Sequence, residues 1–190
     1  MKLSEPHSNP DVRIISLGAG VQSTVMALMA AKGELDPMPD CAIFADTGYE
    51  PQGVYDHLEW LEKQLPFPTY RVSSGNIKSD IQKGVNTTGT RFVAMPFFTR
   101  EGGMGMRQCT NEYKIVPLKK KTRELLGLKP RQRAKDEVSE TWLGISWDEM
   151  QRMKESRDKF IYHRFPLIEK QMRRHHCMTW FEEHYPGRSL

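Results

Sequence analysis

The sequence has little cysteine and no long hydrophobic run. Its three cysteines, Cys41, Cys109 and Cys177, are odd in number and lie far apart. This pattern excludes a disulfide-stapled scaffold and favours a reducing compartment. No apolar run approaches the ~20 residues that a membrane-spanning helix needs, and the first residues lack the apolar centre of a secretory signal. We therefore expect a cytoplasmic protein with no membrane partner.

A strong charge of one sign is also lacking. The formal net charge is +4 over 190 residues, which suits an anionic ligand but does not by itself indicate nucleic-acid binding. Hydrophobic residues make up 38% of the chain, so the composition excludes a disordered protein and predicts a packed core. We expect a flexible lead-in over residues 1–11 and a single domain over residues 12–190.

Buried apolar runs alternate along the chain with segments of helical periodicity. Such alternation predicts right-handed βαβ crossovers and an α/β fold with a mostly parallel sheet flanked by helices. Residues 84–108 look irregular, and a loop of that length is usually functional. The expected strands cover residues 12–17, 41–45, 69–72, 141–145 and 161–165, and the expected helices cover 23–32, 54–64, 76–83, 117–126, 148–159 and 168–184.

A glycine-rich turn joins the first expected strand to the first helix. Glycines let the backbone approach a ligand closely, and the unpaired N–H groups and the dipole of a helix N-terminus favour phosphate or sulfate. The turn is neither a Walker A loop nor the six-residue dinucleotide glycine pattern. The alternative is an ordinary strand-to-helix turn. The candidate phosphate-binding residues are Gly18, Ala19, Gly20, Gln22, Ser23 and Thr24.

A polar turn follows the second expected strand. Asp46, Thr47 and Gly48 lie where that strand ends, and ligands of open α/β sheets bind at the carboxyl ends of strands. Asp46 could hold a ribose or a metal ion. The alternative is a helix N-cap cluster, because Asp, Thr and Gly all suit that position.

Two cations flank a cysteine after the long loop. Arg107 and Lys114 could clamp phosphate or sulfate oxygens, and Cys109 between them could have thiolate character. The alternative for Cys109 is a small buried hydrophobic residue. The basic side chains of residues 119–123 are expected to form a solvated helix face.

A fourth strand-to-helix turn begins at Gly144, the last candidate binding residue. Asp148 and Glu149 follow it and suit a helix N-terminus for purely structural reasons. The run His175-His176-Cys177 does not make a zinc site, because neighbouring helix positions point apart and no second Cys/His pair has the right spacing. We therefore assign no metal-ligating residue.

Together these motifs resemble the phosphoadenosine phosphosulfate (PAPS) reductase family of the adenine nucleotide alpha-hydrolase, or PP-loop ATPase, superfamily. The PP-loop signature Ser-Gly-Gly-x-Asp-Ser resembles residues 18–23, and the Asp-Thr-Gly of the second strand resembles residues 46–48. The family's Arg-x-Cys-x-x-x-x-Lys-x-x-Pro element resembles Arg107, Cys109, Lys114 and Pro117. Its Gly-Ile-x-x-Asp-Glu element resembles Gly144, Ile145, Asp148 and Glu149.

The resemblance implies a Rossmann-like domain and an adenine-nucleotide-binding enzyme acting in sulfur transfer or adenylyl activation. The ligand would be ATP, with Mg²⁺, or a PAPS-type adenine nucleotide. Arg107, Cys109 and Lys114 would then be catalytic, and a thioredoxin-like reductant would serve a sulfur-transfer reaction. The alternatives are a subunit of nucleic-acid sulfur modification, which would bind a nucleic acid through residues 114–135, and a binding-only relative without catalysis.

The chain departs from the family pattern at two residues of the PP-loop and at the C-terminal end. Gly18 replaces the first Ser of the PP-loop, and Gln22 replaces the Asp that belongs to ATP cleavage. The reductases' C-terminal Glu-Cys-Gly segment has no counterpart, and relatives with an iron–sulfur cluster carry a Cys-x-x-Cys pair where this sequence stops, at Leu190. A truncated chain or a member without the redox half would explain the last departure, and a cluster is expected only if such cysteines exist.

Overall fold

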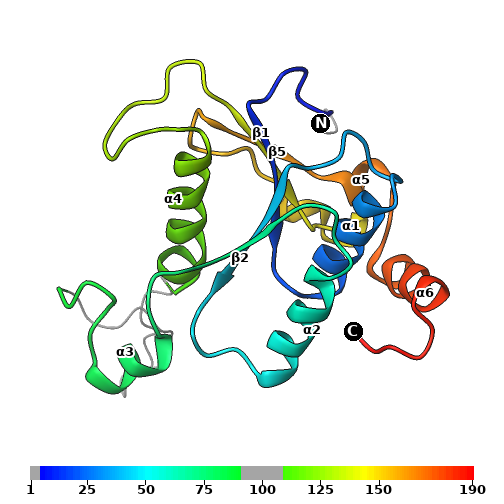
Figure 1. The fold of residues 1–190 in the computed structure, drawn as a ribbon, viewed down its shortest axis with the longest axis horizontal. Coiled ribbons are helices and arrows are strands. Elements are labelled where there is room, and N and C mark those ends of the chain that lie inside the picture. Colours follow the sequence, from blue (N-terminus) through cyan, green and yellow to red (C-terminus); the bar gives the residue numbers. More distant parts are fainter. Residues whose placement is uncertain (1–4, 91–108) are drawn as a thin grey trace.

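The computed structural model describes residues 5–90 and 109–190. Five strands form one sheet in the order β3-β2-β1-β4-β5, and all neighbouring pairs are parallel (Figure 1). The expected parallel α/β architecture is therefore confirmed. The strands are β1 (Val12–Leu17), β2 (Cys41–Asp46), β3 (Thr69–Ser73), β4 (Ser139–Leu143) and β5 (Ile161–Arg164).

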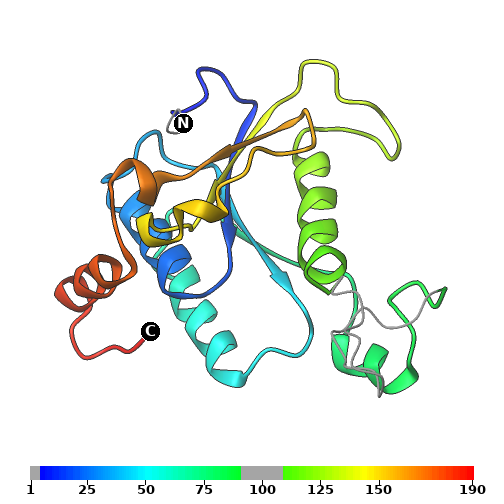
Figure 2. The same cartoon turned by 180° about the vertical axis from the view of Figure 1, so that it is seen from behind.

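Helices cover both faces of the sheet. Helix α4 lies on one side, and α1, α2 and α6 lie on the other (Figures 1 and 2). In β1, the neighbours Ile14 and Ile15 are both fully buried because their side chains enter opposite cores. Strands buried on both faces read as unbroken apolar runs rather than alternating ones. The helices are α1 (Val21–Ala31), α2 (Gln52–Glu62), α3 (Ile77–Lys83), α4 (Val116–Leu125), α5 (Pro166–Glu169) and α6 (Arg174–His184).

The strand order reverses at β1. The chain proceeds from β1 to β2 and β3 on one side, and then places β4 and β5 on the other side of β1. A crevice forms outside the carboxyl ends of the strands at such a switch point, and ligands of open α/β sheets bind there. The turns that follow β1 and β4 therefore flank the expected binding position.

Two expected helices differ in the structure. Residues 148–159 do not form one helix; a short 3-10 helix, η2 (Trp147–Arg152), takes their first part. None of its residues is buried, and a helix that buries no apolar face gains little from packing. The expected helix over 168–184 is broken between α5 and α6, where Gln171 has a φ of 53° and the backbone leaves the helical region.

Two helix starts also differ. Helix α1 begins at Val21, two residues before the expected start at residue 23. Helix α4 is preceded without a gap by a π-helical turn, η1 (Asn111–Ile115). Pro117 lies in the first turn of α4, as expected, where a residue without an N–H is tolerated; the π-helical turn before it was not predicted.

Within the described ranges, no helix is both long and apolar enough to cross a membrane. Residues 5–10 lie against the β4–β5 side of the sheet, where the Tyr162 hydroxyl donates to the Glu5 carbonyl at 2.9 Å and the His7 N–H donates to Glu140. Residues 84–90, the described part of the long segment, contain turns and an isolated bridge.

Candidate functional site

The turn between β1 and α1 is closed by a serine. The Gly18 N–H donates to Ser23 Oγ at 3.2 Å, and Ser23 Oγ donates to the Gly20 carbonyl at 3.1 Å. Gly20 is the N-cap of α1, but no side chain caps the helix there. A Cβ added at Gly20 would meet nothing within 4 Å. The first turn of α1 therefore has no side-chain cap and has open space beside Gly20, and it has the form of a cradle for a small anion.

Ala19 carries the strain in this turn. Its φ of 53° places it in the left-handed region, which costs a residue with a Cβ roughly 1–2 kcal/mol. The residue is held there because the serine bonds close the turn on both sides. Strained backbone of this kind clusters at ligand-binding sites.

The turn after β4 presses against the turn after β1. A Cβ added at Gly144 would lie 2.9 Å from both the Cα and the N of Ser23. Real Cβ atoms do not approach backbone atoms so closely, so position 144 requires glycine. The structure thereby brings together two sequence-predicted motifs that are more than a hundred positions apart.

Gln22 joins the turn to two further elements. Its Oε1 accepts a hydrogen bond from Arg174 Nη1 of α6 at 3.0 Å, and its Nε2 donates to Glu149 Oε2 at 3.4 Å. Glu149 also forms an ion pair with Arg152 at 2.5 Å. Arg174 is a polar residue of the site that the sequence did not single out, because nothing in its local pattern links it to a turn 152 positions away.

Asp46 bonds within its own loop. Its Oδ1 accepts from the Gly48 N–H at 2.7 Å and from the Tyr55 hydroxyl at 2.9 Å. Burial, followed by the bond to Asp46, raises the pKa of Tyr55, so this phenol stays a proton donor. These contacts agree with the structural alternative for Asp46, in which a turn carboxylate organises its own backbone.

Gly48 anchors the same loop to α3. Its φ is 72°, and an added Cβ would lie 3.0 Å from the Cα of Asn76. The Asn76 amide donates to the Gly48 carbonyl at 2.7 Å, and its Oδ1 accepts from the Ser79 N–H and caps α3. Thr47 donates from Oγ1 to Glu50 Oε1 at 3.1 Å. The loop after β2 is therefore rigidly built.

Lys114 reaches the loop after β2. Its Nζ lies 3.6 Å from Glu50 Oε1, at the end of the π-helical turn η1. Glu50 is a second polar residue of the site to which the sequence assigned no role. Since β1 and β2 are adjacent parallel strands, the loop that contains Glu50 and the turn after β1 lie at the same edge of the sheet.

The three cysteines have different environments. Cys41 and Cys177 are buried, and burial raises the pKa of their thiols to about 12 and about 11. Cys109 is partly exposed. Arg107, the other predicted cation of this motif, lies outside the described residues, as does the segment 91–108.

His57 supports the site from α2. Its Nε2 lies 3.0 Å from Thr24 Oγ1, which is fully buried in α1. Burial, and then the charge of Arg188, lowers the pKa of His57. A neutral imidazole therefore fixes Thr24, and Thr24 serves the packing of the turn. Among the described residues, no group of three or more His, Cys, Asp or Glu side chains could hold a metal ion.

Comparisons with known proteins give a match at the level of structure. Neither a family model nor a curated protein matches the sequence. Among solved structures, the chain is similar to the crystal structure of PAPS reductase from Candida auris in a phosphate complex, with a TM-score of 0.54 and 16% sequence identity. The match covers 93% of this chain and 74% of that one. The likeness establishes a PAPS reductase-like fold.

Proposed function

We propose that this chain binds an adenine nucleotide, with the phosphates on the turn between β1 and α1, and acts as a PAPS reductase-like enzyme. One observation carries the proposal. The N-terminus of α1 has no side-chain cap, and the space beside its N-cap, Gly20, is open. This turn lies where the strand order reverses, and Gly144 closes it from the neighbouring strand. Backbone N–H groups and the dipole of a helix favour phosphate at such a position.

The fold comparison supports the same assignment. The structurally similar PAPS reductase from Candida auris was crystallised as a phosphate complex. The motifs of residues 18–23, 46–48 and 144–149 resemble those of that family and lie at or next to the carboxyl edge of the sheet. The residues at this edge thus suit both the anionic and the hydroxyl-bearing parts of a nucleotide.

Different residues would bind different parts of the nucleotide. The backbone of Gly18–Ser23 would hold phosphate oxygens, and the loop that begins at Asp46 would face the ribose. Lys114 would neutralise charge that develops on the transferred group once it separates from Glu50. Arg107 is assigned the same role by its motif.

Two reactions fit this arrangement. With ATP, an acceptor oxygen would attack the α-phosphorus; a bond between the acceptor and the adenylyl group would form, the bond to the bridging oxygen would break, and pyrophosphate would leave. With a phosphosulfate nucleotide, a thiolate would attack sulfur; a sulfur–sulfur bond would form, the sulfur–oxygen bond would break, and the nucleotide would leave with its phosphate. A thioredoxin-like dithiol would then reduce the thiosulfonate to a thiol and sulfite.

Cys109 is the thiol that this second reaction requires. Cys41 and Cys177 are buried with raised pKa values, and a protonated buried thiol is a poor nucleophile. Cys109 is partly exposed and lies one helical turn before Lys114. Sulfite release that is lost in Cys109→Ser, with nucleotide binding kept, would assign the reaction.

The direct test is calorimetric titration of the wild-type chain with ATP, adenosine phosphosulfate and PAPS. The matched variants are Gly20→Asp and Gly20→Asn. Both residues are good N-caps, and position 20 has the extended backbone and the free space that they need. Both variants should therefore fold, but the carboxylate of Gly20→Asp should repel phosphate.

We expect Gly20→Asp to weaken nucleotide binding at least tenfold more than Gly20→Asn. A wild-type chain that binds none of the three nucleotides would refute the proposal. So would a Gly20→Asp variant that binds nucleotide as tightly as Gly20→Asn.

A nucleic-acid partner is the second candidate, and the exposed loop before β4 favours it. Lys129, Arg131, Arg133 and Lys135 are all exposed. In contrast, Lys119 and Lys121 of α4 pair with carboxylates at 2.5 and 2.7 Å. Binding that falls steeply with salt and disappears when these four residues are neutralised would support this function.

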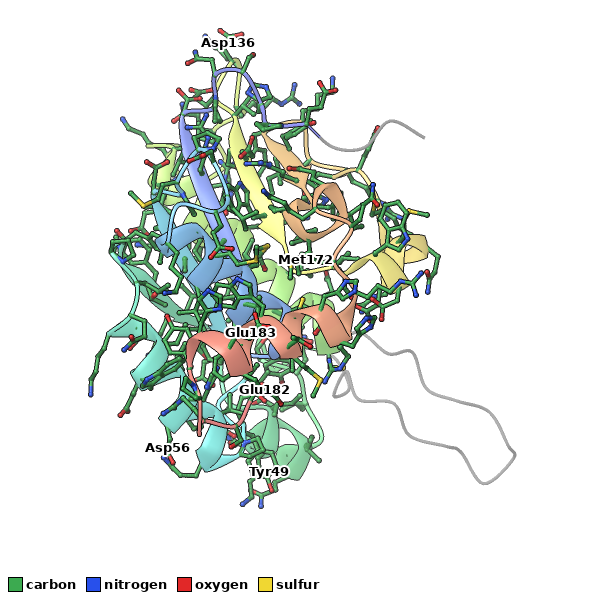
Figure 3. The ribbon with its side chains drawn as sticks, turned by 90° about the vertical axis from the view of Figure 1, so that its right-hand side faces the viewer. Tyr49, Asp56, Asp136, Met172, Glu182 and Glu183 are labelled. Carbon is green, nitrogen blue, oxygen red and sulfur yellow. The ribbon has the colours of Figure 1, made fainter. Side chains whose placement is uncertain are left out.

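The position of this loop separates the two candidates. The loop precedes the amino end of β4, whereas the turn after β1 lies at the carboxyl end of the sheet. Figure 3 shows Asp136 of this loop at one end of the molecule and Tyr49 of the β2 loop at the other. A nucleic acid bound at residues 129–135 would therefore have to cross the domain to reach the proposed phosphate site.

A further inference from the structure

The guanidinium of Arg174 lies beside the proposed phosphate site, and we infer that it binds the terminal anionic group of the nucleotide. This inference rests on the proposed function and names a residue that no motif of the sequence indicates. The relevant group is a tetrahedral oxyanion at the outer end of the tail, either the γ-phosphate of ATP or the sulfate of a phosphosulfate.

Arg174 is held next to the start of α1. Arg174 Nη1 donates to Gln22 Oε1 at 3.0 Å. Gln22 is the second residue of α1 and lies two positions after Gly20, the N-cap. The guanidinium is therefore held against the first turn of the helix whose N-terminus forms the anion cradle.

Arg174 differs from two other cations of the site in the charge of its partner. Lys114 and Arg152, two other cations of the site, each have a carboxylate partner, at 3.6 and 2.5 Å. Within the described part of the chain, no carboxylate oxygen forms an ion pair with Arg174, and its side chain bonds to the neutral amide of Gln22. A neutral partner orients the guanidinium but leaves its charge and its remaining N–H donors for a ligand.

The start of α6 is held in place by hydrogen bonds to the turn after β4. The backbone N–H of Arg174 donates to Asp148 Oδ1 at 3.0 Å. The nearby Ser146 side chain, and then this bond, lower the pKa of Asp148, so the carboxylate stays ionised. In addition, the Trp147 N–H donates to the Met172 carbonyl at 2.7 Å. Figure 3 shows Met172 directly before α6. The start of α6 is thus tied to the turn after β4, and little ordering is left to occur when an anion binds.

The test compares Arg174→Gln, Arg174→Lys and the neighbouring control Arg173→Gln by calorimetric titration. Arg173 is also exposed and carries the same charge, and among the described residues no hydrogen bond or ion pair joins its side chain to the α1 turn. The probes are pyrophosphate, AMP, ATP and adenosine phosphosulfate. Thermal unfolding of each variant checks that it folds, and the loss of one exposed side chain at α6 should leave the fold intact.

We expect Arg174→Gln to weaken the binding of ATP and of pyrophosphate about 10- to 100-fold, which is the effect of losing one charge-assisted contact. The affinity for AMP, which lacks the outer phosphates, should fall less than threefold. Arg174→Lys should keep most of the affinity, and Arg173→Gln should change it less than threefold. A similar loss for ATP and adenosine phosphosulfate would show that the site accepts either oxyanion, and a selective loss would identify the native one.

The inference and the proposed function fail separately. If the wild type binds nucleotide and Gly20→Asp abolishes binding, but Arg174→Gln binds like the wild type, the inference is wrong and the function stands. An equal loss in Arg174→Gln and Arg173→Gln would also overturn the inference, because the effect would then be general charge. If the wild type binds neither nucleotide nor pyrophosphate, both are wrong.

Discussion

Gly144 packs directly on Ser23, so closely that a Cβ at position 144 would lie 2.9 Å from the Ser23 backbone. The contact joins the turn after β4 to the turn after β1 at the point where the strand order reverses. It fixes the shape of the proposed anion cradle from outside the motif that forms it. The cradle thus depends on a residue that the glycine-rich segment does not contain.

Gly144→Ala should therefore disturb both stability and binding. We expect a loss of about 1–3 kcal/mol in the free energy of unfolding, since the new methyl group meets backbone that cannot move aside. Urea unfolding measures this loss, and titration should show weaker phosphate binding. Gly53→Ala in α2 is the control, because a Cβ there meets nothing within 4 Å. Equal stabilities for the two variants would contradict the close approach.

Ala19→Gly should stabilise the chain. The φ of 53° disfavours a residue with a Cβ, and glycine would remove that strain at a smaller entropic cost in the unfolded state, for a net gain of about 0.5–1 kcal/mol. Gln171 has the same φ outside the site, so Gln171→Gly should show a similar gain without any change in nucleotide affinity. A loss of stability in both variants would show that the strain is not real.

The stability should fall at mildly acidic pH because of His57. Its pKa is lowered in the folded state by burial and by Arg188, so below the ordinary value of 6.5 the unfolded chain binds a proton that the folded chain does not. The penalty is absent above pH 6.5 and grows as the pH falls toward the folded pKa. Urea unfolding at pH 7.5 and pH 5.5 measures it.

His57→Gln keeps a hydrogen-bonding partner for Thr24 and does not titrate. The difference in unfolding free energy between the two pH values should shrink in this variant. His175→Gln is the control, since His175 is an exposed histidine of α6. If His57→Gln and the wild type lose equal stability, the imidazole does not cause the effect.

The cysteines should react in a fixed order. Cys109 is partly exposed, whereas the thiols of Cys41 and Cys177 are buried with pKa values raised to about 12 and about 11. Iodoacetamide at pH 8 should label Cys109 first, and peptide mass spectrometry identifies the site. All three should react in urea. Rapid labelling of Cys177 in the folded chain would contradict its burial in the core.

Much of the fold could be predicted because its signals are local. Unbroken apolar runs such as residues 12–17 and 41–45 predicted strands buried on both faces, and the structure places β1 and β2 there. The segment 148–159 misled because its composition favours a helix, although no apolar face of it is buried. Tertiary packing decides whether such segments form helices, and a local sequence pattern contains too little information about that packing.

The sequence alone determined the order of the five strands and of helices α1 to α4, the glycine-rich turn before α1 and the candidate residues of the site. Apolar periodicity and glycine placement act over a few positions, so they can be recognised locally. The tertiary structure decided which of these residues meet. Gly144 on Ser23, Lys114 at Glu50 and Arg174 at Gln22 are contacts between segments far apart in the chain. They arise from the reversal of strand order at β1, from the packing of η1 on β2 and from the packing of α6 on α1, which no local pattern encodes.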